Sequence, residues 1–432
     1  MKLLKKLSAI LLAIMLLFGS MPMADLGLEN FFSSIAFAVE EDYEEEEEYI
    51  ETKKDFVSGD YIYRYTKNKE IRIIKYMGSD KNVTVPETID GMPVIRIDLA
   101  AFCPDFSYEN YTSYKQYNNP ECENIESVTL PDSITQIHHY AFRNCKSLQS
   151  IDMPENLVSI GRQAFYECKN LRNIDMPENL SSIGEQAFMN CSSLESLEFS
   201  NLSSIGIKAF MGCSSLENLE FSDQLTSIGG NAFSGTKIKN LNIASGEKNF
   251  SAYSSMLVGS VVENITIEAK SITINSNALN SETLKNIELK ATEKLTIESS
   301  GIVSNALENL TVEGKIISIK NSGIKSNALK TLTLDAAVSI GESGIVSNSL
   351  ETLTLSGAME SVAEKAILCP SLKIVTINGD VTGCATSAFG FRGDDTLPDT
   401  VVVNNCFSTD VYDMFEEFLD YVGEVTFTDT VK

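Results

Sequence analysis

Hydrophobic positions recur along the middle of the chain with a period of about 23 residues. An Ala-Phe pair marks each period, and its phenylalanines are Phe142, Phe165, Phe188, Phe210 and Phe233. Cysteine follows three residues after Phe in the first four periods, and Thr236 takes the same place in the fifth. A fixed period of this length is typical of a solenoid, in which each period forms one coil.

Each period contains a short apolar strand and a return segment. The strand segment Leu148-x-x-Ile151-x-Met153 has the Leu-x-x-Leu-x-Leu form of a leucine-rich repeat, in which alternate side chains point inward. The return segment contains Ile-Gly-x-x-Ala-Phe, as in 160–165, and we expect its glycine to permit the backbone angles of a tight turn. A coil covers its apolar side chains only against its neighbours, so stability is expected to come from stacking.

The pattern Leu-Pro-x-x-Ile-x-x-Ile-Gly-x-x-Ala-Phe-x-x-Cys-x-x-Leu is almost unbroken from Leu130 to Leu216. It resembles the BspA-like, or treponemal-type, leucine-rich repeat family. The resemblance implies an α/β or mainly β solenoid, a right-handed superhelix with a parallel β-sheet on its concave face. It also implies a secreted or surface-displayed bacterial protein, some of whose relatives are adhesins for host matrix proteins or other cells. It implies no catalytic residues.

The ends of the chain differ from the repeats. Three lysines precede the apolar run 7–18, and a small-residue site at 36–38 follows, which indicates a secretory signal peptide. Alternation in short runs between 56 and 97 predicts a β-rich cap, and apolar residues at helical spacing over 410–422 predict a capping helix. The expected order is a signal peptide (1–38), an acidic disordered linker (39–55), a β-rich N-terminal cap (56–98), leucine-rich repeats (99–243), degenerate repeats (244–360), last repeats (361–403) and a C-terminal helical cap (404–432).

The repeat pattern becomes less regular after Gly246. Ser-Asn-Ala-Leu or a close variant recurs there, while Ala-Phe is missing until Phe389. Strand segments such as Leu310-Thr311-Val312 remain recognisable, with threonine where the earlier coils carry acids. We therefore expect these coils to return through thinner, more β-like turns and to continue one solenoid.

A tyrosine-rich insertion, residues 104–120, interrupts the first coil. Cys122 stands 20 residues after Phe102 instead of three. The inserted tyrosines are Tyr108, Tyr111, Tyr114 and Tyr117. Tyrosine with serine and asparagine is the composition of contact loops, and insertions in solenoids often fall on the binding face. The alternative is that the insertion folds down and shields the first coil.

Acidic residues occupy one outward position of successive strands. They are Asp152, Asp175, Glu198 and Glu220. Strands of adjacent coils lie about 4.8 Å apart, so neighbouring carboxylates repel one another by about 1 kcal/mol per pair in water. Solvation alone can offset that cost. The other interpretations are a stripe for a basic partner, or for a divalent metal shared between columns.

Charge and cysteine content narrow the class of protein. A formal net charge of −26 disfavours binding to nucleic acid and to anionic membranes. The nine cysteines are an odd number, and five of them hold one repeat position, so small apolar core residues are expected there. Cys103–Cys122 and Cys384–Cys406 remain candidate disulfide pairs.

The function predicted from these features is binding of a protein partner. The partner is a host matrix or surface protein, with a structural scaffold without a host ligand as the alternative. Arg392-Gly393-Asp394 is a further, short candidate contact motif, which in host-associated adhesins can engage integrins. An enzyme is not expected, because the histidines, His138 and His139, are adjacent at a variable position that indicates the surface. No catalytic, cofactor or metal site, and no membrane span after signal cleavage, is predicted for this extracellular protein.

Overall fold

The structure is a computed structural model, and it describes residues 54–105, 118–172, 174–379, 381, 383 and 388–389, with the backbone of 400–404 and 425–428. These residues all lie in one compact unit, Lys54–Lys432. The predicted capping helix at 410–422 and the predicted signal peptide lie outside the described residues. The described elements are strands, together with one short 3-10 helix, η3 (Pro120–Asn124).

The described chain begins with a small β meander. Strands β1, β2 and β3 pair antiparallel in sequence, and β5 pairs antiparallel with β6. Strand β3 also pairs parallel with β6, which pairs with β8, so the meander is continuous with the coils that follow. The strands of this region are β1 (Phe56–Ser58), β2 (Tyr61–Tyr65), β3 (Ile71–Tyr76), β5 (Thr88–Ile89) and β6 (Met92–Ile97).

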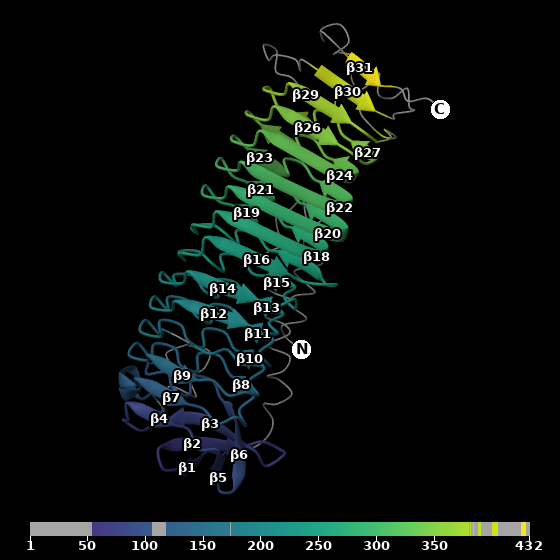
Figure 1. Cartoon of the computed structure of the whole chain (residues 1–432). Helices are drawn as coiled ribbons and strands as arrows, with labels where there is room; N and C mark the ends of the chain where they lie inside the picture. Colours follow the sequence, from purple (N-terminus) through teal and green to yellow (C-terminus); the bar gives the residue numbers. More distant parts are fainter. Residues whose placement is uncertain are drawn as a thin grey trace, which may run out of the picture. The chain divides into compact units, whose positions relative to one another are not determined.

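The strands of the first coils form two parallel columns (Figure 1). The first column comes from the Leu-x-x-Ile segments, and its strands are β4 (Asn82–Thr84), β7 (Ser127–Thr129), β9 (Ser150–Asp152), β12 (Ser196–Phe199), β14 (Asn218–Phe221) and β16 (Asn240–Ala244). The second column precedes the Ala-Phe turns in all but its last strand, and its strands are β8 (Gln136–Ile137), β10 (Ser159–Ile160), β11 (Ser182–Ile183), β13 (Ser204–Ile205), β15 (Ser227–Ile228) and β17 (Asn249–Ala252). Equivalent residues of successive coils pair in register, as Glu198 does with Glu220.

The later coils join the two columns through single long strands that bend round the corner (Figure 1). These are β18 (Asn264–Ile274), β20 (Asn286–Ile297), β22 (Asn309–Ile319) and β24 (Thr331–Ile340). The columns end in β26 (Thr352–Leu355), β27 (Met359–Val362), β29 (Ile374–Ile377), β30 (Thr400–Asn404) and β31 (Val425–Thr428). The predicted β-like returns are confirmed as a third parallel column: β19 (Leu279–Asn280), β21 (Ile302–Val303), β23 (Ile324–Ser326), β25 (Ile345–Ser347) and β28 (Ile367–Leu368).

The core of the early coils is a continuous stack of phenylalanine rings. Phe142, Phe165, Phe188, Phe210 and Phe233 are all fully buried. Successive ring centroids among these five are 5.1–6.1 Å apart, with planes within 3–7° of parallel. Burial of a phenylalanine side chain contributes about 1.5–3 kcal/mol to the stability of the fold. In this stack, the surface of each ring is covered only by the coils above and below it.

The repeated cysteines fill the core as predicted. The thiols of Cys145, Cys168, Cys191 and Cys213 donate to the carbonyl oxygen of the preceding coil's phenylalanine at 3.1–3.2 Å. Burial raises the pKa of Cys213 to about 12. Cys103 and Cys122 are buried with free thiols in this structure, while Cys384 and Cys406 lie outside the described residues.

The predicted role of the repeated glycine was wrong. Gly161, Gly184, Gly206 and Gly229 do not adopt left-handed backbone angles. A Cβ atom added at any of them would lie 2.5–2.8 Å from backbone atoms of the preceding coil. The left-handed positions of the turn are two residues further on and carry other side chains: Gln163, Gln186, Lys208 and Asn231. Glycine is therefore required by the close approach of adjacent coils.

Candidate binding surface

Of the four acidic residues predicted to form a column, Glu198 and Glu220 are register partners on adjacent strands of the first strand column. Asp152 ends β9, and Glu198 and Glu220 lie at the same register position in β12 and β14. Asp175 lies beyond the buried Ile174, in a coil that has no named strand there. All four side chains are exposed, because they alternate with buried aliphatic residues along each strand. We call Asp152, Asp175, Glu198 and Glu220 the acidic column.

No cation neutralises the acidic column within the described part of the chain. Asp152 accepts a hydrogen bond from Thr129 Oγ1 at 2.9 Å. Among the described residues, Asp175, Glu198 and Glu220 make no ion pair and no side-chain hydrogen bond. Their oxygens are therefore available to a partner.

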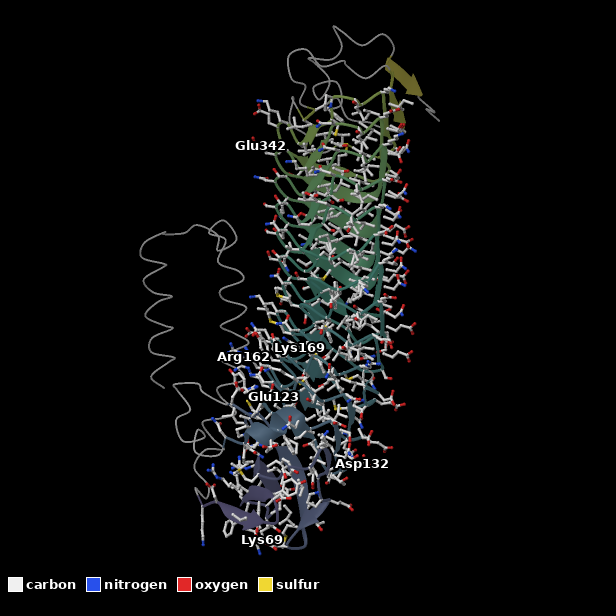
Figure 2. The ribbon with its side chains drawn as sticks, turned by 90° about the vertical axis from the view of Figure 1, so that its left-hand side faces the viewer. Lys69, Glu123, Asp132, Arg162, Lys169 and Glu342 are labelled. Carbon is white, nitrogen blue, oxygen red and sulfur yellow. The ribbon has the colours of Figure 1, made fainter. Side chains whose placement is uncertain are left out.

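A second acidic series runs beside the acidic column, in the turns that follow the strands. Its members are Asp132, Glu155, Glu178 and Asp223, all exposed. The backbone amide of Glu155 donates to Asp132 Oδ1 at 3.0 Å, so the turns stack as regularly as the strands. Asp132 lies on the opposite side of the coils from Arg162 and Lys169 (Figure 2). The acidic column thus has a further acidic series next to it.

A neighbouring column in the later coils follows a different rule, which the sequence analysis missed. The residue before each strand alternates in sign over eight coils: Glu217, Lys239, Glu263, Lys285, Glu308, Lys330, Glu351 and Lys373. We call this set the alternating column. Lys285 Nζ lies 3.0 Å from Glu263 Oε2, and Lys373 Nζ lies 3.1 Å from Glu351 Oε2. Aligning the residue that precedes each repeated Asn or Thr would have revealed this pattern in the sequence.

The remaining candidate contact residues lie outside the described residues. They are the four tyrosines Tyr108, Tyr111, Tyr114 and Tyr117, and the motif Arg392, Gly393 and Asp394. The structure therefore does not place them relative to the acidic column. They stay predictions from the sequence.

The two histidines are not simple surface residues, which corrects the prediction. Their rings lie 4.4 Å apart and are half-buried, and His139 Nδ1 accepts the backbone N–H of Arg162 at 2.8 Å. Burial, with His138 and Arg162 nearby, lowers the pKa of His139 to about 3. The early coils carry Asp98 and His138 where later coils carry glycine, so these side chains fill the space between coils.

A buried charged cluster surrounds Asp98. Its carboxylate lies 3.4 Å from Arg96 Nη2 and 3.6 Å from Arg72 Nη1, and it accepts the N–H of Leu99 at 3.0 Å. Burial alone would raise the pKa of Asp98, but Arg96, His138 and Arg72 lower it to about 2. An ionised, fully paired carboxylate of this kind joins the N-terminal coils to one another and offers no acid or base at neutral pH.

No group of three or more His, Cys, Asp or Glu side chains in the described residues has a metal-binding arrangement. None of the helices in the described part of the chain has the length and apolar character needed to span a bilayer.

Similar solved structures come from several bacteria. A leucine-rich repeat protein of T. pallidum is 24% identical, over 51% of this chain and 86% of that one, with a TM-score of 0.36. A leucine-rich cell surface protein of Faecalibacterium prausnitzii is 19% identical, over 84% and 97%, with a TM-score of 0.42. The pneumococcal vaccine antigen PcpA is 16% identical, over 87% and 99%, with a TM-score of 0.37.

The family of the chain is shown by its sequence rather than by the solved structures. No curated protein matches the chain. Residues 112–206, 193–301 and 295–394 match the BspA type leucine-rich repeat region, in six copies. Because the matched residues cover more than half of the chain, the protein belongs to the BspA-type leucine-rich repeat family.

Proposed function

We propose that this protein is an exported bacterial binding module whose acidic column contacts a basic protein partner. The acidic column carries the proposal, because it keeps like charges in register with no cation beside them. The alternating column of the same chain shows how stacked coils can remove such repulsion, by placing Lys opposite Glu. A surface that retains the repulsion is suited to a partner that supplies the missing positive charge.

The surface location rests on the sequence. The N-terminal lysines and apolar run predict export. The family and the neighbouring cell surface protein of Faecalibacterium prausnitzii support a place outside the cell. A host matrix protein, or a protein of another cell, is the class of partner that this location provides.

The experiment is a binding screen of the purified protein against fibronectin, fibrinogen, collagen and laminin at low and high salt. We expect saturable binding to at least one basic segment of these proteins, weaker at high salt because exposed charges are screened. A second sample lacks residues 106–117 and tests the tyrosine-rich insertion. Binding that survives this deletion and weakens with salt supports the acidic column, whereas binding lost with the insertion assigns the contact to its tyrosines.

A structural scaffold, or a cell-envelope interaction protein without a host ligand, is the competing function. It predicts no saturable binding to any matrix or cell-surface protein at either salt concentration. That outcome would contradict the proposed adhesion and leave the acidic column as a solvated face.

A further inference from the structure

The corner between the first and second strand columns becomes shorter from β20 to β24. Five residues separate the buried Leu289 and Leu295 of β20, four separate Val312 and Ile317 of β22, and three separate Leu334 and Val338 of β24. The strand register shifts at the same places, between Lys290 and Lys294 and between Glu313 and Ile316. The wall of the solenoid therefore changes its outline from β20 to β24.

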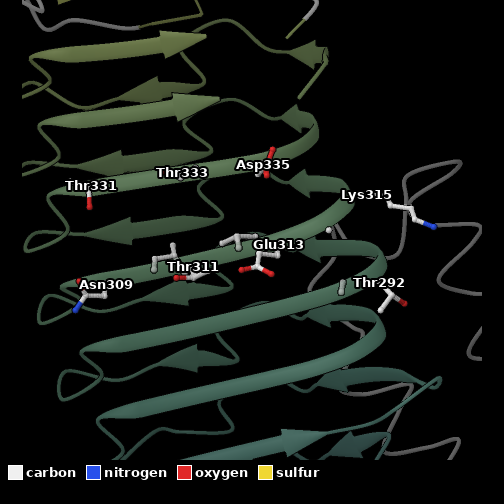
Figure 3. Close-up of a pocket in the computed structure, with 12 residues that line it drawn as sticks. Thr292, Asn309, Thr311, Glu313, Lys315, Thr331, Thr333 and Asp335 are labelled. Atoms are coloured by element: carbon white, nitrogen blue, oxygen red, sulfur yellow. The ribbon is translucent and has the colours of Figure 1, made fainter. Parts of the chain in front are cut away.

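A cavity of about 620 Å³ lies at this step (Figure 3). Thr292 of β20 and Gly314 of β22 line it at the corner, and the outward residues of β22 and β24 line the rest. Gly314 has no side chain to fill the space. A Cβ atom added there would lie 3.6–3.8 Å from its neighbours, an ordinary contact, so glycine is not required by the backbone. The volume is within the range of small-molecule sites, about 300–1,000 Å³.

Ala291, Leu310 and Val312 are the apolar residues that line the cavity, and the other side chains that line it are polar. They provide hydroxyl, amide, carboxylate and ammonium groups: Thr292, Asn309, Thr311, Glu313, Lys315, Thr331, Thr333 and Asp335. Among the described residues, Thr311, Thr333, Glu313 and Asp335 make no side-chain hydrogen bond or ion pair. Figure 3 shows Thr311 and Glu313 along β22, with Thr333 and Asp335 along β24. Their hydrogen-bonding groups are turned to solvent or to a ligand.

The charges of the cavity restrict the ligand further. Glu313 and Asp335 are register partners on adjacent strands. Lys290, the nearest cation of that column, instead pairs with Glu288 at 2.7 Å and with Glu268 at 3.5 Å. Lys315 also lines the cavity, and its side chain extends away from Glu313 and Asp335 (Figure 3). The carboxylate pair thus accepts hydroxyl or ammonium donors and repels acidic groups.

We propose that this cavity binds a neutral or amino-substituted saccharide. Sugar hydroxyls both donate and accept, as do the threonines on the floor, and carboxylates are strong acceptors for hydroxyl donors. The outward side chains from Asn309 to Glu313 extend over about 13 Å at the rise of a strand, which admits more than one sugar ring. The cavity has no aromatic platform among its lining residues, so recognition here is by hydrogen bonds.

The test is calorimetric titration of the purified full chain with cellotetraose, chitotetraose, its deacetylated form and tetragalacturonic acid. We expect binding of a neutral or amino tetrasaccharide and none of the acidic one. Thr311→Val with Thr333→Val should weaken that binding by about 2–10-fold per hydroxyl, since each loses a hydrogen bond. Thr266→Val with Thr354→Val, in the same register on β18 and β26, is the matched control and should leave it unchanged.

Gly314→Phe should abolish the binding by filling the cavity, whereas Gly314→Ala should retain it. Circular dichroism and urea unfolding of both variants check that the coils are intact. Saccharide binding should also survive Asp175→Ser with Glu198→Ser, because that surface is separate. No heat with any of the four saccharides, or equal affinity for the two threonine double variants, would overturn the proposal.

Discussion

At the residue scale, the spacing between coils decides which side chain a position accepts. Gly184 lies so close to the preceding coil that a Cβ atom would be 2.7 Å from the amide nitrogen of Arg162 and the carbonyl carbon of Gly161. Gly314, in contrast, has room for a methyl group. Gly184 therefore does not tolerate a larger side chain, whereas Gly314 does. Neither the composition nor the period of the repeats reveals this difference.

Replacing Gly184 by alanine should therefore destabilise the protein. The added methyl group cannot be relieved by a side-chain rotation, because both close neighbours are backbone, and overpacking of this kind costs about 1–3 kcal/mol. Gly314→Ala is the control and should be neutral or slightly stabilising. Urea unfolding followed by circular dichroism compares the two midpoints, and equal midpoints would refute the close-approach explanation.

Asp98→Asn should lower stability in a pH-dependent way. The pKa of Asp98 in the folded protein, about 2, is below the ordinary value of 3.8. Folding therefore gains stability from the ionised carboxylate above pH 3.8, about 2 kcal/mol, and loses it as the pH falls towards 2. The variant also removes the negative charge that lies beside Arg72 and Arg96.

The measurement is urea unfolding of both proteins between pH 7 and pH 2.5. The difference in free energy of unfolding between the wild type and Asp98→Asn should be largest at pH 7 and should become smaller below pH 4. A difference that stays constant across this range would show that the carboxylate charge is not what stabilises the first coils.

At the element scale, the coil is the repeating structural unit. The regular stacking of coils continues across the tyrosine-rich insertion. The rings of Phe102 and Phe142 are 4.8 Å apart although 39 residues lie between them in the sequence. Asn119, near the end of the insertion and beyond its tyrosines, donates to the carbonyl oxygens of Tyr76 and Gly78 at 3.3 and 2.7 Å, and caps η3. The coil is thus closed by residues on either side of the tyrosine-rich segment.

Exchanging residues 106–117 for a short Gly-Ser linker should leave stability nearly unchanged. The stacked rings and the Asn119 contacts remain in that variant. Asn119→Ala should instead cost about 1–3 kcal/mol, because two buried carbonyl groups lose their donor. Thermal unfolding of both variants is the measurement, and a larger loss from the linker exchange would mean that the insertion supports the first coil.

At the scale of the whole molecule, the sequence repeats made the fold predictable. The binding surface was less predictable from the sequence. The 23-residue period, with Phe142 and Cys145 as its markers, predicts stacked coils, because only a repeated unit buries such a pattern. The acidic column was also readable, since Glu198 and Glu220 occupy one frame position. The joined long strands were not predictable from Leu310 and Ile317 alone, because the bend between them depends on the length of the corner.

Contacts between coils were harder to predict than contacts within one. The alternating column pairs Lys285 with Glu263 across 22 residues, and the cavity beside Gly314 results from different corner lengths in neighbouring coils. Both depend on comparing one coil with the next. Both features can be recognised in the sequence only after the coils are aligned with one another.

The acidic column, rather than the total charge of the chain, should determine partner binding. The most direct measurement compares two variants with the same change in net charge across a series of salt concentrations. Asp175→Ser with Glu198→Ser removes half of the acidic column, and Glu308→Ser with Glu351→Ser removes two acids of the alternating column. Surface plasmon resonance with the partner found in the screen gives the dissociation constant of each.

We expect the Asp175 and Glu198 variant to bind at least tenfold more weakly, with a shallower dependence of affinity on salt, because two contacts of about 1 kcal/mol each are lost. The Glu308 and Glu351 variant should bind as the wild type does. Equal loss of affinity in both variants would show that net charge alone attracts the partner and would contradict recognition by the acidic column.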